Sequence, residues 1–156
     1  MKGKTHAIQF HFLTQSVTLK NRTTLKAFIL ELIKGEGKEA DTLNYIFCSD
    51  EYLLGINQQY LNHDTYTDII TFELSNRGEP LISDIYISID RVKANARTFS
   101  TTFTRELHRV IFHGTLHLCG YKDKNKVQEK VMREKEEEYL GKYFVPRDTV
   151  SQRNNR

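Results

Sequence analysis

The chain has 156 residues, of which 38% are hydrophobic and 28% are charged, and it contains no Trp. A chain of this length is expected to form one domain whose core needs no disulfide support, and the composition excludes wholesale disorder. The formal net charge of +3 is too small to indicate a polyanionic partner by itself. The two cysteines, Cys48 and Cys119, follow no paired pattern, so we expect free thiols in a reducing compartment.

The N-terminal segment, MKGKTHAIQFHF, lacks the apolar centre of a signal peptide. No apolar run in the sequence approaches the ~18 residues that a membrane span requires. We therefore expect a cytoplasmic protein without a membrane partner.

Strand and helix periodicities alternate along the first half of the chain. Residues 6–12 alternate between apolar and polar side chains, which predicts a strand. Residues 21–37 place apolar side chains at helical spacing, with Asn21 as the expected N-cap and a glycine at the end. A second strand is expected over residues 42–48, followed by a short helix that ends near Tyr60.

The second half begins with two strands and ends with helices. The strands are expected over residues 68–74 and 81–89, paired across the polar turn SNRGEP. Asp90 is the expected cap of the next helix, and another helix follows and ends at Cys119. The final helix is expected over residues 126–140, where most side chains are charged.

This order of elements predicts an α+β fold with a small mixed sheet of about four strands and surrounding helices. We expect a single metallo-hydrolase-like domain over residues 1–145. Residues 146–156 have few apolar side chains to bury, which predicts a mobile C-terminal tail.

The segment HGTLHLCGYKD, residues 113–123, contains a candidate metal site. On a helix, His113 and His117 lie one turn apart, with Cβ atoms roughly 5–6 Å from one another. Gly120 stands where a helix C-terminus needs a left-handed residue, so the chain can turn back and bring Asp123 beside the histidines. Two imidazoles, one carboxylate and an open position are typical of catalytic zinc, although nickel, cobalt and iron remain open.

The residue after the first histidine limits the chemistry of this site. Peptidases with an H-E-x-x-H motif have a glutamate there as general base, whereas this chain has Gly114. A metal ion still polarises a phosphoryl oxygen and acidifies its water, so phosphodiester hydrolysis fits at least as well as proteolysis. No side chain is assigned as the catalytic base, and the water on the metal is expected to act alone.

Three segments together resemble a known family. HGTLHLCGYKD resembles H-G-x-L-H-L-x-G-Y-D-H, the signature of the YbeY family of metal-dependent endoribonucleases. The stretch from Ile56 to Phe72 resembles a second family block, L-N-x-x-Y-R-x-x-D-x-P-T-D-V-L-S-F, and SDIYISID resembles a third, G-D-I-x-I-S. The blocks follow one another in the order and spacing of the family, so the resemblance is specific.

The resemblance implies a bacterial, cytoplasmic endoribonuclease that prefers single-stranded RNA and binds one zinc ion. Members of the family process ribosomal RNA, notably the 3′ end of the small-subunit RNA, and take part in ribosome quality control. Ribosomal RNA is thus the implied partner, together with ribosome-associated proteins. Carried over by position, the metal ligands are His113, His117 and Asp123.

Three departures from the family pattern matter for the chemistry of the site. Asp123 replaces the third histidine and adds negative charge, which should make the water on the metal less acidic. Lys122 replaces an aspartate, and Leu61 stands where the family commonly has an arginine. We expect Lys122, Arg105 and Arg109 to contact RNA instead, although these cations are equally consistent with a solvated basic face.

Two other functions remain open from the sequence. A metallopeptidase-like hydrolase is favoured by the spacing of the ligands and disfavoured by Gly114. A non-enzymatic ribosome-associated factor with a structural metal is kept open by Leu61.

Overall fold

The structure is a computed structural model that describes residues 5–61 and 66–154, with side chains described over residues 6–61 and 66–144. Its elements alternate between strands and helices before a run of three helices. In chain order they are η1 (Thr5–Ala7), β1 (Ile8–Phe12), α1 (Arg22–Gly35), β2 (Ala40–Cys48), α2 (Asp50–Leu61), β3 (Ile69–Glu73), β4 (Leu81–Ser88), α3 (Ile89–Thr98), α4 (Phe103–Leu118) and α5 (Lys126–Asn154).

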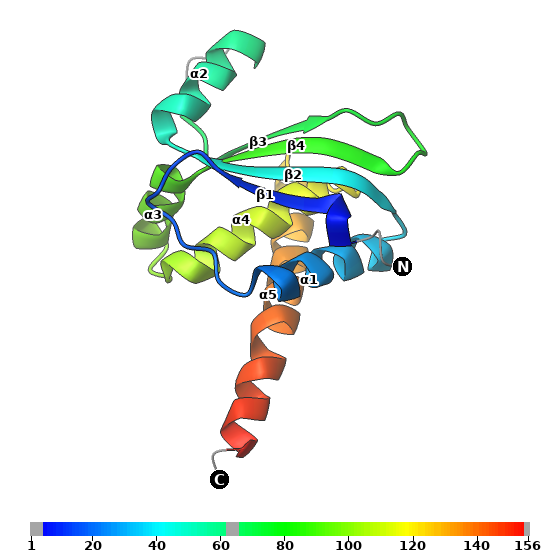
Figure 1. Cartoon of the computed structure of the whole chain (residues 1–156), viewed down its shortest axis with the longest axis vertical. Coiled ribbons are helices and arrows are strands. Elements are labelled where there is room, and N and C mark those ends of the chain that lie inside the picture. The colour runs from blue at the N-terminus through cyan, green and yellow to red at the C-terminus, as the bar shows by residue number, and fades with distance from the viewer. Residues whose placement is uncertain (1–4, 62–65, 155–156) are drawn as a thin grey trace.

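The strands form one mixed sheet in the order β1-β2-β4-β3 (Figure 1). Strands β1, β2 and β4 are parallel, and β3 runs antiparallel to β4 at one edge. The hairpin expected between the third and fourth strands is therefore confirmed. The mixed four-stranded sheet with its helices also confirms the predicted α+β class.

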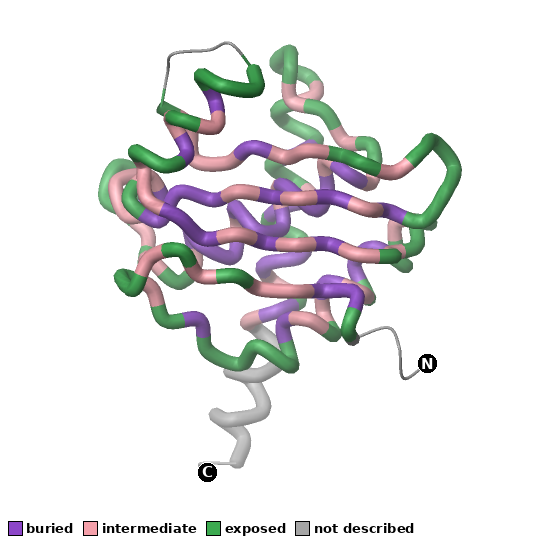
Figure 2. Tube along the Cα trace, turned by 45° about the horizontal axis from the view of Figure 1, so that its top comes forward, coloured by how far each residue is buried: buried purple, intermediate pink, exposed green. Residues whose placement is uncertain are grey.

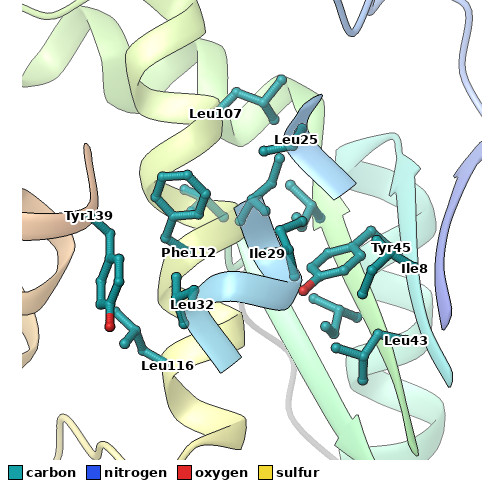
Figure 3. Packing of buried hydrophobic residues seen from close by; sticks show 14 of the residues in the cluster. Ile8, Leu25, Ile29, Leu32, Leu43, Tyr45, Leu107, Phe112, Leu116 and Tyr139 are labelled. Atoms are coloured by element: carbon teal, nitrogen blue, oxygen red, sulfur yellow. The ribbon is translucent and has the colours of Figure 1, made fainter. Parts of the chain in front are cut away.

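One face of the sheet forms the core. Burial alternates along the strands (Figure 2), as expected for strands with one covered face. Helices α1 and α4 cover the buried face, and α5 packs against α4 on the side away from the sheet (Figures 1 and 3). Side chains of α1, α4 and the strands meet there, including Leu25, Ile29, Leu32, Leu43, Tyr45, Phe112 and Leu116.

Helix α2 lies on the opposite face of the sheet and covers only part of it. Leu53 of α2 is buried with Cys48 and Ile70, and Tyr52 stacks on Tyr86 with ring centroids 6.3 Å apart. Because α2 follows β2 and precedes β3, this packing places the C-terminal end of α2 beside the sheet edge at β3.

Several local details differ from the sequence expectations. Asn21 precedes α1 in a left-handed conformation and makes no side-chain cap, and Ser88 rather than Asp90 caps α3 by accepting a hydrogen bond from the Arg91 backbone N–H at 3.1 Å. The serine precedes the first helical residue, whereas Asp90 already lies within the helix. Its hydroxyl is therefore the group that can reach a free N–H of the first turn.

The last helix runs further than residue 140. The backbone of α5 is helical through Asn154, and the predicted mobility of residues 146–156 stays a prediction. Val127 and Val131 are exposed, whereas Met132 and Leu140 are buried. The described residues contain no helix long and apolar enough to cross a membrane, and both cysteines are free.

Candidate metal centre

Helix α4 is fixed against the sheet by the residues between its two histidines. The hydroxyls of Tyr45 on β2 and Thr115 are 2.6 Å apart in the buried interior. Gly114 brings the helix so close to the sheet that a Cβ there would lie 2.7 Å from Ile69 Cδ1 and 3.3 Å from Ile85 Cγ2. This contact holds the adjacent face of α4 at the edge of the sheet beside β3.

The end of α4 turns the chain back as the sequence predicts. Gly120 has a φ of 109°, and its N–H donates to the carbonyl of His117 at 3.0 Å. The Tyr121 N–H donates to the Leu116 carbonyl at 3.1 Å, which completes a Schellman motif. The hydroxyl of Tyr121 then donates to Glu36 at the end of α1 at 2.8 Å. The loop that carries Asp123 is thus held at the end of α4.

The three predicted ligands converge. Nε2 of His113 lies 3.3 Å from Oδ2 of Asp123, and Nε2 of His117 lies 3.5 Å from the same oxygen. One ligand atom from each residue lies within 4.8 Å of the others. Bonds of about 2.0–2.1 Å at tetrahedral angles would separate zinc ligands by roughly 3.3–3.4 Å, so this donor set fits a zinc ion.

The ligands line a cleft of about 660 Å³. Its other walls are the C-terminal end of α2, the segment before β3, and β3 itself, which contribute Asn57, Leu61, Tyr66, Thr67, Asp68, Ile69, Ile70, Thr71 and Glu73. Asp123 and His117 are partly exposed in this cleft. A substrate in the cleft would therefore reach the side of the site that the protein leaves open.

Buried charges lie behind His113. Its Nδ1 is 2.5 Å from a carboxylate oxygen of Glu136 on α5, whose other oxygen accepts from Arg109 at 3.0 Å. Arg109 also binds both carboxylate oxygens of Glu106, at 2.9 and 2.7 Å. Glu106 and Glu136 are buried, with 2% and 3% of their surface exposed. Two buried carboxylates thus share one guanidinium.

This arrangement shifts the pKa values of its members. Burial favours the neutral form of Glu136, but the hydrogen bond from His113 and the charge of Arg109 outweigh it and lower the pKa of that carboxyl. Burial opposes the charge of Arg109 as well, but its two carboxylate partners raise its pKa further. For Asp68, 3.9 Å from Arg109, burial prevails and raises the pKa.

The three cations expected to contact RNA have different surroundings. Lys122 is exposed next to Asp123. Arg105 pairs with Glu137 at 3.2 Å beside a separate cavity of about 300 Å³. Arg109 lies between its carboxylate partners, with which an RNA phosphate would have to compete. Contact of these three residues with RNA stays a prediction.

Sequence analysis did not single out Glu136 or Glu106. Both occur at buried positions of otherwise amphipathic helices, α5 and α4. Each is a charged residue within a helical stripe of apolar residues. This pattern could have predicted a buried ion pair or hydrogen bond, because a buried charge needs a partner.

Comparisons with known proteins show a family to which this chain is similar. A model of the family described as endoribonuclease YbeY matches residues 9–144. The chain is 50% identical over 127 residues to the endoribonuclease YbeY of Flavobacterium psychrophilum, which covers 81% of this chain and 90% of the relative. The chain is 44% identical over 138 residues to the endoribonuclease YbeY of Flavobacterium johnsoniae, and the match covers 88% of this chain and 98% of the relative.

One solved structure is similar over nearly the whole chain. The solution structure of TM1509 from Thermotoga maritima superposes with a TM-score of 0.63 at 29% identity and covers 92% of this chain and 93% of that one. The match confirms the single α+β architecture.

Proposed function

The chain belongs to the endoribonuclease YbeY family, and on that premise we propose that it is a metal-dependent endoribonuclease that cleaves single-stranded RNA. The observation that carries the proposal is the approach of His113 Nε2 and His117 Nε2 to one oxygen of Asp123 inside the cleft. His117 and Asp123 are partly exposed in this cleft, which supports access by an extended strand from solvent.

The proposed roles of the side chains follow from their positions. His113 and His117 offer neutral nitrogens from one face of α4, and Asp123 offers a carboxylate from the loop that follows. When bound there, a divalent ion, zinc by our expectation, acidifies a water and offsets charge on the scissile phosphate. Lys122 is proposed to steady the neighbouring phosphate, because it is exposed beside the ligand Asp123.

The proposed substrate is ribosomal RNA, at the 3′ end of the small-subunit RNA. The three sequence blocks shared with the family support this substrate and a role in ribosome quality control, in the cytoplasm and alongside ribosome-associated proteins. Arg105 and Arg109 are retained as proposed RNA contacts outside the loop of Asp123.

The surroundings of Gly114 argue against the metallopeptidase alternative. A side chain at this position would point at Ile69 and Ile85 on the face of the sheet that α4 covers. A glutamate there would have to displace the sheet, so the general base of an H-E-x-x-H peptidase has no room at this position.

The test is cleavage of a labelled single-stranded RNA by wild type that contains one metal ion per chain and by variants treated in the same way. We expect the wild type to cleave and His117→Ala to be inactive. His11→Ala is the matched control, because His11 is exposed on β1 and bonds Asn44, far from the cleft in the fold. It should cleave as the wild type does.

Each other outcome contradicts the proposal in a different way. Equal cleavage by wild type and His117→Ala would point to a contaminating nuclease. Failure of the metal-loaded wild type on both free RNA and isolated small subunits would favour a factor with a structural metal. Cleavage of a peptide library that His117→Ala abolishes would favour the peptidase.

A further inference from the structure

One ring nitrogen of His113 faces Asp123, and the other contacts a carboxylate from another helix. Its Nδ1 lies 2.5 Å from Oε2 of Glu136, which is 23 residues away in the sequence. Glu136 is 3% exposed, so its carboxylate is buried between α5 and α4. Water has little access to this contact, so a water molecule cannot readily take the place of the Glu136 carboxylate.

The contact determines which nitrogen of His113 is free. An ionised carboxylate only accepts hydrogen bonds, so the ring proton resides on Nδ1. Nε2, which faces Oδ2 of Asp123 at 3.3 Å, is then the nitrogen left to bind a metal ion when one is present. A neutral imidazole with a free Nε2 is the form that binds a metal ion.

Arg109 holds Glu136 in this orientation. It donates to the Glu136 oxygen that His113 does not use, at 3.0 Å. The same guanidinium is fixed by two hydrogen bonds that it donates to the carboxylate of Glu106, one turn before Arg109 on α4. The guanidinium also supplies positive charge for both buried carboxylates, which keeps Glu136 ionised and acceptor-only.

We propose that Glu136 is a positioning residue of the metal site: held by Arg109, it fixes the ring and tautomer of His113 and thereby raises the affinity of the site for zinc. This role rests on the metal site of the proposed function, but not on cleavage of RNA.

The test compares three substitutions on α5. Glu136→Leu removes the acceptor, and Glu136→Gln keeps an acceptor oxygen without the charge. Glu134→Gln is the control, because Glu134 is an exposed residue half a turn away on the same helix. The zinc dissociation constant is measured by competition with a chromophoric chelator, at a temperature where the metal-free variants are folded by circular dichroism.

We expect Glu136→Leu to weaken zinc binding by about 10–100-fold, the usual effect of losing a partner of a metal-bound histidine. Glu136→Gln should have a smaller effect, and Glu134→Gln should stay within about twofold of the wild type. A second measurement concerns the hydrogen bond itself. In ¹H–¹⁵N spectra of the zinc-bound protein, the Nδ1 proton of His113 should exchange slowly with solvent in the wild type and faster in Glu136→Leu.

The outcomes separate the two proposals. A wild type that binds no zinc would overturn the metal site of the proposed function. A wild type that binds zinc while both Glu136 variants match it within twofold would overturn only the positioning role. If Glu136→Leu does not fold, Glu136→Gln decides: unchanged zinc affinity and unchanged exchange of the His113 Nδ1 proton would contradict the proposal.

Discussion

Asp123 is the residue at which the proposed metal site of this chain departs from the family signature. Its carboxylate is the only negative ligand expected there, and its loop is held by the Schellman motif at Gly120. We expect Asp123→Ala to weaken zinc binding more than the ~10–100-fold effect of losing an outer partner, because a direct ligand is lost. Asp123→His should bind zinc, since imidazole is an equally competent ligand.

Isothermal titration of both variants with zinc tests this prediction, with Lys122→Ala as the control at the adjacent exposed position. Zinc binding by Asp123→Ala that equals the wild type would remove Asp123 from the ligand set.

At the scale of elements, the contact between α4 and the sheet depends on Gly114. We expect Gly114→Ala to destabilise the fold by about 1 kcal/mol, because overpacking against Ile69 and Ile85 outweighs the gain in helix propensity. Gly141→Ala is the matched control, since a Cβ at that position of α5 meets no atom within 4 Å. It should stabilise the fold by about 0.5–1 kcal/mol. Urea denaturation measures the free energy of unfolding of both variants. Equal changes in the two variants would contradict the prediction, because Ile69 and Ile85 would then have moved to accommodate the added methyl group.

Three elements are joined at Glu36, at the end of α1. Its carboxylate accepts hydrogen bonds from Tyr139 and Lys135 of α5 and from Tyr121 of the loop before Asp123. Burial alone would raise the pKa of Glu36, but these hydrogen bonds outweigh it and lower the pKa below 4.5. The ionised form is therefore the one that stabilises the folded state.

A lowered pKa makes this contribution to stability depend on pH. It is present above the pKa of the unfolded chain and is lost as pH falls through the folded value. We expect Glu36→Gln to cost about 1–3 kcal/mol at pH 7 and progressively less in acid. Urea midpoints at pH 7 and in acid test this, with the exposed Glu31→Gln as control on the same helix. A cost that does not change with pH would show that the charge contributes nothing.

At the scale of the whole molecule, local patterns predicted most of the fold and the ligands. Alternation in β2 and helical spacing in α4 are properties of short windows, and the positions of His113, His117 and Gly120 lie within one such window. Asp123 could be added because a glycine-terminated helix reverses the chain within a few residues. The predicted features were therefore those determined by neighbours in the sequence.

The features that sequence reasoning missed depend on packing between distant elements. Glu136 reaches His113 only because α5 crosses α4, and Tyr121 reaches Glu36 across 85 residues. The apolar stripe of α5 indicates which of its faces is buried, but not that this face brings Glu136 to His113.

The location of the core predicts how the whole protein responds to loss of metal. The main buried cluster lies between the sheet, α1, α4 and α5, and none of the three proposed ligands belongs to it. We therefore expect the chelated protein to remain folded and to melt cooperatively. Zinc at about 100–1,000 times its Kd should add about 2.7–4.1 kcal/mol, which corresponds to a Tm increase of roughly 5–16 °C for a chain of this size.

Thermal melts with zinc and with chelator, followed by circular dichroism, measure this difference. His117→Ala is the control, because its Tm should change little between the two conditions while its chelated form melts near the chelated wild type. Unfolding of the wild type on chelation would contradict the prediction, because the metal would then be required for folding. That result would favour a structural ion over a catalytic one.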